Sequence, residues 1–207
     1  MNVELSAHHY LQAAGHEARM RRWRDESAGE YTVHHLEIPG EVDADVLRWY
    51  LRTYTPESYL LWHPSHLAHV REEVQPTQGR KFVVFEWING WLQADRMWGG
   101  APLELCPEEP EHADRAVLTA VLDTDGEPFR HILIEVDPVE GGGVVSRGTW
   151  TFPAATPKQY IDGLLAHCRE ERVGMVERAI PYAIQRHFGY TPPLDRVREE
   201  LRLMEAQ

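Results

Sequence analysis

The sequence contains little cysteine. Its 207 residues include only Cys106 and Cys168, which lie far apart and form no CxxC pair. Two isolated thiols argue against a disulfide framework and against a thiolate zinc site, and a reducing cytoplasm is the expected location.

Long apolar runs are also missing. No stretch of about 18 apolar residues, the length needed to cross a bilayer, occurs in the chain. The first residues, MNVELSAHHY, lack the pattern of a signal peptide. We therefore expect a soluble protein that does not enter a membrane.

Basic residues are too few for a nucleic-acid binder. The chain has 21 Lys and Arg against 33 Asp and Glu, which gives a net charge of −12. Such a balance argues against nucleic acid and against anionic lipid as partners. The expected partner is therefore a small molecule. Seven Trp and eight Tyr suit the lining of a cavity for an aromatic ligand, and they also suit a bulky core, which is the commoner role of aromatic side chains.

The length allows one large domain with short additions at its ends. Residues 1–28 are polar, carry the basic cluster ARMRRWR, and are expected to form a helical extension that packs on the surface or helps a homo-oligomer contact. Residues 29–190 would form the main domain. Residues 191–207 are expected to form a short charged helix or tail.

Within the main domain the residue pattern predicts a mixture of helices and strands. Helices are expected from Asp43, from Pro56, around His66–Val70, and over 157–187, where Thr156 would cap the long helix and Pro181 would kink or split it. Strands are expected at 31–38, 81–88, 91–98, 116–122, 129–136 and 144–152, with an Asn-Gly turn between the second and third. This α+β order resembles the helix-grip fold of START-like and pollen-allergen-like proteins, in which a curved antiparallel sheet wraps a long C-terminal helix.

Polar side chains interrupt apolar sequence in three places. YLLWHPSHLAH offers His63, His66 and His69, and Glu86 stands alone within the apolar strand VVFEWI. LLAHCREE carries His167 and Glu171, whose four-residue spacing puts both on one face of a helix. Buried carboxylates need a cation, a donor or a proton, and two histidines with two carboxylates would satisfy a divalent ion.

Ordinary structural roles remain open for each of these side chains. Glu86 could instead pair with Arg130 or Arg147 on a neighbouring strand. His167 and Glu171 could simply hydrogen-bond each other, and a histidine before a proline is often structural.

The three motifs in order resemble the 2,4-diacetylphloroglucinol hydrolase family, whose members are zinc-dependent hydrolases of a carbon–carbon bond on a helix-grip domain. The resemblance implies a Zn²⁺ site formed by His63, Glu86, His167 and Glu171, with His66 and His69 as alternatives for the first ligand. It also implies a substrate that is an acylated phenol (acylphloroglucinol-like) or a related polyketide compound.

The residues around this site receive expected roles on the same basis. Glu86, His66 and Tyr160 are the candidate catalytic groups. The candidate substrate-binding residues are Tyr54, Tyr59, Trp62, Trp87 and His131. Two other functions fit the same sequence: a non-catalytic carrier of an aromatic or apolar molecule, and a metal-free cyclase-like enzyme of polyketide assembly.

Overall fold

The computed structural model describes residues 29–38, 42–88, 90–107, 109–138, 140, 144–153 and 156–206. The strands are β1 (Gly29–Ile38), β2 (His66–Arg71), β3 (Arg80–Ile88), β4 (Trp91–Ala101), β5 (Ala116–Leu122), β6 (Pro128–Pro138) and β7 (Val144–Pro153). The helices are α3 (Ala44–Thr53), α4 (Pro56–Tyr59), the 3₁₀ turns η1 (Leu103–Leu105) and η2 (Ala113–Arg115), α5 (Lys158–Gly174), the π-helix η3 (Met175–Ala179), α6 (Ile180–Phe188) and α7 (Leu194–Glu205). The predicted extension over residues 1–28 lies outside the described residues.

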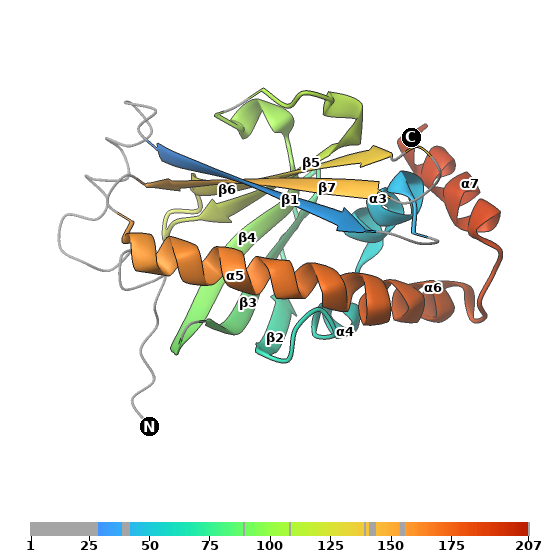
Figure 1. Ribbon diagram of the computed structural model, residues 1–207, viewed down its shortest axis with the longest axis horizontal. Helices are drawn as coiled ribbons and strands as arrows, with labels where there is room; N and C mark the ends of the chain where they lie inside the picture. The colour runs from blue at the N-terminus through green and yellow to red at the C-terminus, as the bar shows by residue number, and fades with distance from the viewer. Residues whose placement is uncertain are drawn as a thin grey trace.

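The strands form one antiparallel sheet in the order β1-β7-β6-β5-β4-β3-β2. Strands β2 to β7 each pair with the next along the chain, whereas β1 pairs with β7 because α3 and α4 carry the chain to the opposite edge of the sheet. The helix α5 crosses one face of this sheet and contacts both β1 and β3 (Figure 1). The predicted α+β helix-grip architecture is therefore confirmed.

The hairpin between β3 and β4 follows the predicted turn. Ile88 pairs with Trp91, so two residues close the loop. Gly90 adopts φ +83°, a left-handed conformation that glycine accepts without strain.

The predicted short helix around His66–Val70 is wrong, because this segment is the edge strand β2. Its register on β3 shifts between His66 and Ala68, which marks a β-bulge. The bulge lets His66, paired with Glu86, and His69, paired with Val84, face the same side although they are three residues apart. The three-residue spacing of these histidines is also the spacing of residues on one face of a helix, so the sequence predicted a helix here.

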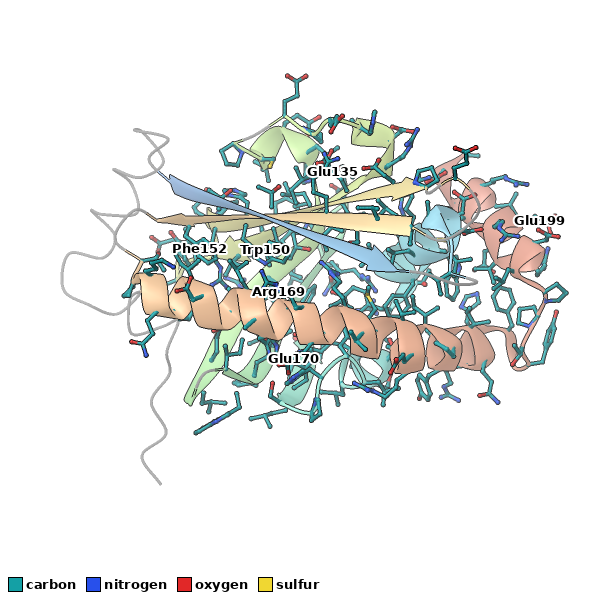
Figure 2. The ribbon with its side chains drawn as sticks, viewed as in Figure 1. Glu135, Trp150, Phe152, Arg169, Glu170 and Glu199 are labelled. Atoms are coloured by element: carbon teal, nitrogen blue, oxygen red, sulfur yellow. The ribbon has the colours of Figure 1, made fainter. Side chains whose placement is uncertain are left out.

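The apolar side chains of α5 seal the helix against the sheet. Ile161, Leu164, Leu165 and Cys168 form a buried cluster with Ile88 of β3 and with Trp150 and Phe152 of β7. Figure 2 shows Trp150 and Phe152 beside the helix. A second cluster of Ala101, Leu118, Ala120 and Leu122 on β4 and β5 packs with Leu103 of η1.

The long C-terminal helix begins one residue later than predicted and changes character midway. Pro157 is the N-cap of α5, and no side chain caps it, so the predicted Thr156 cap is wrong. The π-helix η3 precedes Pro181, which sits in the first turn of α6. Proline has no N–H to donate to the previous turn, so a local change of helical pitch here has a clear cause.

Close packing joins this helix to the turn after α4. A Cβ added at Gly174 would overlap the backbone carbonyl of Trp62, so only glycine fits there. The guanidinium of Arg178 donates to the carbonyls of Leu61, at 3.0 Å, and Trp62, at 3.1 Å. The turn that leads into β2 is thus held against the helix.

The short charged helix predicted within residues 191–207 is α7, which packs on α3. Val197 and Leu201 are buried in the main core, and Arg198 pairs with Asp43 at 2.5 Å. In the described part of the chain, no helix combines the length and apolar character needed to span a bilayer.

Candidate functional site

Four side chains from three elements converge beneath the long helix. His66, Glu86, His167 and Glu171 each offer a ligand atom, and these atoms all lie within 4.8 Å of one another. We call this group the His–Glu cluster. His66 begins β2 and pairs across the ladder with Glu86 of β3, while His167 and Glu171 lie one turn apart on α5. The tethering of the α4–β2 turn to the helix brings the two halves together.

The hydrogen bonds of His66 fix the orientation of its ring. Nδ1 lies 2.9 Å from the carbonyl oxygen of Tyr59, which can only accept, so Nδ1 carries a proton and donates it. The ring also stacks on the ring of Tyr59 at a centroid distance of 4.3 Å. Nε2 therefore points into the cluster, 2.9 Å from Glu171 Oε1 and 3.2 Å from His167 Nε2. An imidazole whose other nitrogen donates to a backbone carbonyl is the usual form of a metal ligand.

His167 is supported from outside the cluster. Its Nδ1 lies 3.4 Å from Ser65 Oγ, which in turn lies 2.7 Å from His63 Nδ1. Nε2 of His63 bonds Glu170 Oε2 at 2.8 Å, at the exposed side of the helix. Burial lowers the pKa of His167 to about 4, so its ring is neutral at neutral pH.

The structure therefore places His66, rather than His63, among the four converging groups. His63 lies outside the cluster, where it orients Ser65, and Ser65 in turn contacts His167. Two contacts explain this placement: the turn after α4 directs His63 toward Glu170, and the pairing of β2 with β3 sets His66 opposite Glu86.

The pKa values of the two carboxylates in the cluster shift in opposite directions. Burial raises the pKa of Glu86 well above its usual value, and the charges of Glu171 and Asp95 raise it further. Burial also opposes the ionisation of Glu171, but the hydrogen bond with His66 and the positive charge of Arg172 help to outweigh it, so its pKa is lowered. The cluster thus favours one ionised and one protonated carboxyl group when no cation neutralises them.

The donor set fits a divalent cation such as zinc. Two imidazole nitrogens and two carboxylate oxygens are a mixed N/O set that zinc accepts, and iron or manganese also accept it. His66 Nε2 and Glu171 Oε1, which are 2.9 Å apart, either share a proton in a hydrogen bond or would both bind a cation. Protons and a metal ion would therefore compete for the same place.

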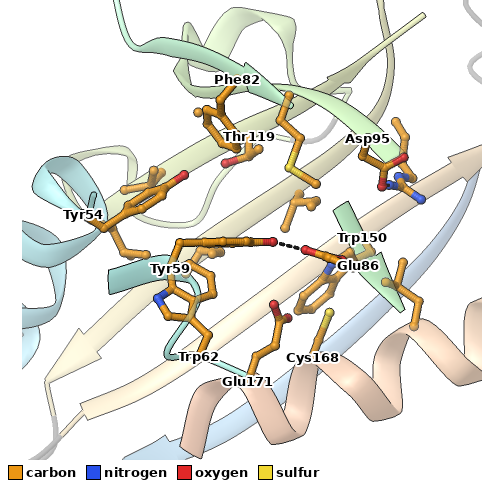
Figure 3. A pocket seen from close by; sticks show the side chains of 18 of the residues that line it. Tyr54, Tyr59, Trp62, Phe82, Glu86, Asp95, Thr119, Trp150, Cys168 and Glu171 are labelled. Carbon is orange, nitrogen blue, oxygen red and sulfur yellow. Dashed lines mark hydrogen bonds and ion pairs between the residues drawn. The ribbon is translucent and has the colours of Figure 1, made fainter. Parts of the chain in front are cut away.

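A cavity of about 80 Å³ lies beside the cluster, and Glu86 and Glu171 form part of its wall (Figure 3). Most of the other lining side chains are aromatic or aliphatic. They include Tyr54, Tyr59, Trp62, Phe82, Met97, Ile132, Ile134, Trp150 and Leu164. The hydroxyl of Tyr59 donates a short hydrogen bond to Glu86 Oε1, which links the cavity to the cluster.

The residues expected to contact a substrate do not all line the cavity. Tyr54, Tyr59 and Trp62 line the cavity. Trp87 does not: it follows Glu86 in β3, points to the opposite face of the sheet and is 40% exposed. His131 is buried, but it follows Arg130 in β6 and likewise faces away from the cavity, so both assignments are wrong.

Tyr160 occupies a supporting position. Its hydroxyl donates to Gln93 Oε1 at 2.8 Å and accepts from Arg130 Nη1 at 2.7 Å. Gln93 and Arg130 stand in the cavity wall, and Tyr160 is not among its lining residues. The expected catalytic role for Tyr160 therefore has no geometric support.

Sequence reasoning missed a second polar group in the cavity wall. Gln93 and Asp95 of β4 face inward with Met97, and Arg130 of β6 forms an ion pair with Asp95. The signal was available in WLQADRMW, where every second residue from Gln93 shares one face of the strand.

Comparisons with known proteins establish the fold. No protein-family profile matches the sequence, and no curated protein is similar to it. A protein of unknown function from Staphylococcus aureus superposes with a TM-score of 0.50 at 13% identity, over 77% of this chain and 99% of that one. A START superfamily protein from Mycobacterium smegmatis superposes with a TM-score of 0.50 at 11% identity, over 72% of this chain and 96% of that one. At these identities the likeness shows the helix-grip fold and nothing about function.

Proposed function

We propose that this chain is a metal-dependent hydrolase that cleaves the carbon–carbon bond between a phenolic ring and its acyl group. The observation that carries the proposal is the His–Glu cluster in the wall of an aromatic cavity. Two buried imidazoles, one buried carboxylate and one partly buried carboxylate, with ligand atoms within 4.8 Å of one another, are costly unless a cation or shared protons compensate them. The resemblance of the sequence motifs to the diacetylphloroglucinol hydrolases supports the choice of reaction.

In the overall reaction, water adds across one bond. The ring carbon that carries the acyl group gains a proton, a water oxygen bonds to the acyl carbonyl carbon, and the bond between these two carbons breaks. Its electron pair restores the aromatic ring. The products are the deacylated phenol and a carboxylic acid.

The proposed role of each residue follows from its position in the site. His66, Glu86, His167 and Glu171 would hold a zinc ion, which when bound supplies Lewis acidity toward a carbonyl oxygen and lowers the pKa of a bound water. Both ring nitrogens of His66 are engaged, so it serves as a ligand and not as the general base. The hydroxyl of Tyr59 contacts Glu86 and faces the cavity, so we propose that it donates the proton that the ring carbon gains. Tyr54 and Trp62 would flank the ring.

The test is acid release from an acylated trihydroxybenzene by purified protein. The proposal expects activity that a chelator removes and zinc restores, and that His167→Ala abolishes. His187→Ala is the matched control, because this histidine lies on α6 and pairs with Glu200 at 2.6 Å. Activity that survives both the chelator and His167→Ala would refute the proposal.

A carrier of an aromatic molecule is the second candidate, favoured by the largely apolar wall of the cavity. A carrier would return its ligand chemically unchanged and would bind it equally well with chelator present. A metal-free cyclase would also ignore the chelator, but it would convert its substrate to a ring-closed product. Mass analysis of the recovered ligand separates these outcomes.

A further inference from the structure

A second set of buried polar side chains faces the cavity and contributes no ligand atom to the His–Glu cluster. Asp95 and Arg130 are 1% and 3% exposed, and Arg130 Nη2 donates a short hydrogen bond to Asp95 Oδ2. Gln93 Nε2 donates to the same carboxylate oxygen. Tyr160 closes the network, since its hydroxyl bonds both Gln93 and Arg130. The network fixes the side chains of Asp95 and Arg130 in the cavity wall.

Two atoms of this network have no hydrogen-bond partner among the described residues. They are Asp95 Oδ1 and Arg130 Nε, and both are shielded from bulk water. Leaving a charged buried group partly unsatisfied is costly. Because Asp95 and Arg130 both line the cavity, a group that enters the cavity is positioned to supply the missing partners.

The chemistry of the two atoms specifies what that group is. Asp95 Oδ1 can only accept a hydrogen bond, and Arg130 Nε–H can only donate one. A hydroxyl does both at once, because its O–H donates while its oxygen lone pairs accept. A carboxylate or phosphate would face the charge of Asp95, and an ammonium group would face the charge of Arg130.

We propose that Asp95 and Arg130 form a hydroxyl-recognition subsite for a neutral, hydroxyl-bearing aromatic ligand. The hydroxyl donates to Asp95 Oδ1 and accepts from Arg130 Nε, while the rest of the ring contacts the aromatic wall. This deepens the proposed function, on which it rests for the identity of the ring, by naming a ring hydroxyl as the feature that selects the substrate.

The test compares ketones that differ by one hydroxyl. Acetophenone and its 2′-, 3′- and 4′-hydroxy derivatives are titrated into metal-free protein, and binding is followed by calorimetry and by the fluorescence of Trp62 and Trp150 in the cavity wall. A hydrogen bond to charged groups predicts that the best hydroxy isomer binds about 10- to 100-fold more tightly than acetophenone. Binding to metal-free protein does not depend on zinc or on turnover, so this result stands apart from the outcome of the hydrolase test.

Variants test whether Asp95 and Arg130 cause the preference for a hydroxylated ketone. The charge-balanced double variant Asp95→Leu with Arg130→Met is expected to lose the hydroxyl preference while still binding acetophenone. If that variant does not fold, Arg130→Lys keeps a charge for Asp95 but removes the Nε donor, and should reduce the preference. The control removes an ion pair of α7, Arg196→Met with Glu199→Leu, which should leave the preference intact. Equal binding of all four ketones by the wild type, or an unchanged preference in the double variant or in Arg130→Lys, would overturn the proposal.

Discussion

The electrostatics of Glu86 predict how the stability of the metal-free protein changes with pH. Burial, followed by the charges of Glu171 and Asp95, raises the pKa of Glu86 well above the ordinary value of 4.5. The folded protein therefore holds a proton on Glu86 at pH values where the unfolded chain has lost it. By linkage, the free energy of unfolding must fall as pH rises from about 4.5 to the folded-state pKa. In Glu86→Gln the side chain is neutral throughout, so this loss should disappear.

The size of the effect follows from one proton. A difference of one bound proton changes the free energy of unfolding by about 1.4 kcal/mol for each pH unit. Between pH 5 and pH 7, the stability of Glu86→Gln relative to the wild type should therefore rise with pH, by at most about 3 kcal/mol. For a domain of this size that gain corresponds to roughly 5 to 10 °C in Tm.

His167 changes the pH dependence of stability in the opposite direction to Glu86. Burial lowers its pKa to about 4 in the folded protein, so between pH 4 and its ordinary value of 6.5 the unfolded chain binds more protons. Stability from this residue is lost as pH falls through that interval. His167 is present in both proteins, so its contribution largely cancels in the comparison.

The assay is urea unfolding of both proteins at pH 5, 6 and 7 with a chelator present. Glu177→Gln is the matched control, because this carboxylate is exposed and lies on η3, further along the same long helix. It should track the wild type at every pH. A constant difference between Glu86→Gln and the wild type, or a difference that shrinks as pH rises, would refute the reasoning.

Three further changes test other contacts. Gly174→Ala should lower Tm markedly, because the new methyl group overlaps the carbonyl of Trp62; an unchanged melting curve would contradict this packing. His66→Ala should abolish zinc binding in a titration, whereas His63→Ala should weaken it only about tenfold, and the reverse order would show that the wrong histidine is assigned. His69→Phe should stabilise the protein by about 1 to 2 kcal/mol in urea unfolding, because neither ring nitrogen of His69 has a partner among the described residues; destabilisation would show that these nitrogens are satisfied.

The sequence was most informative where a polar residue interrupts a strong pattern. Glu86 stands alone in an apolar strand, and His167 and Glu171 share one face of a long amphipathic helix. Burial of such side chains follows from the periodicity of the element that carries them. The order of the elements likewise predicted the helix-grip fold.

The errors came from features that depend on pairing between distant segments. The choice of His66 over His63 depends on a β-bulge, which appears only when β2 is paired with β3. Trp87 and His131 were placed in the cavity although each follows an inward-facing residue, and a step of one residue along a strand reverses the face. The partnership of Asp95 with Arg130 joins residues 35 positions apart, which no local pattern reveals.

The central claim is that the His–Glu cluster holds one divalent cation. The most direct test is a crystal of zinc-reconstituted protein, measured on both sides of the zinc absorption edge. We predict one anomalous peak within bonding distance of the side chains of His66, Glu86, His167 and Glu171. Full reconstitution without a peak there, or a peak bound only by other residues, would contradict the account.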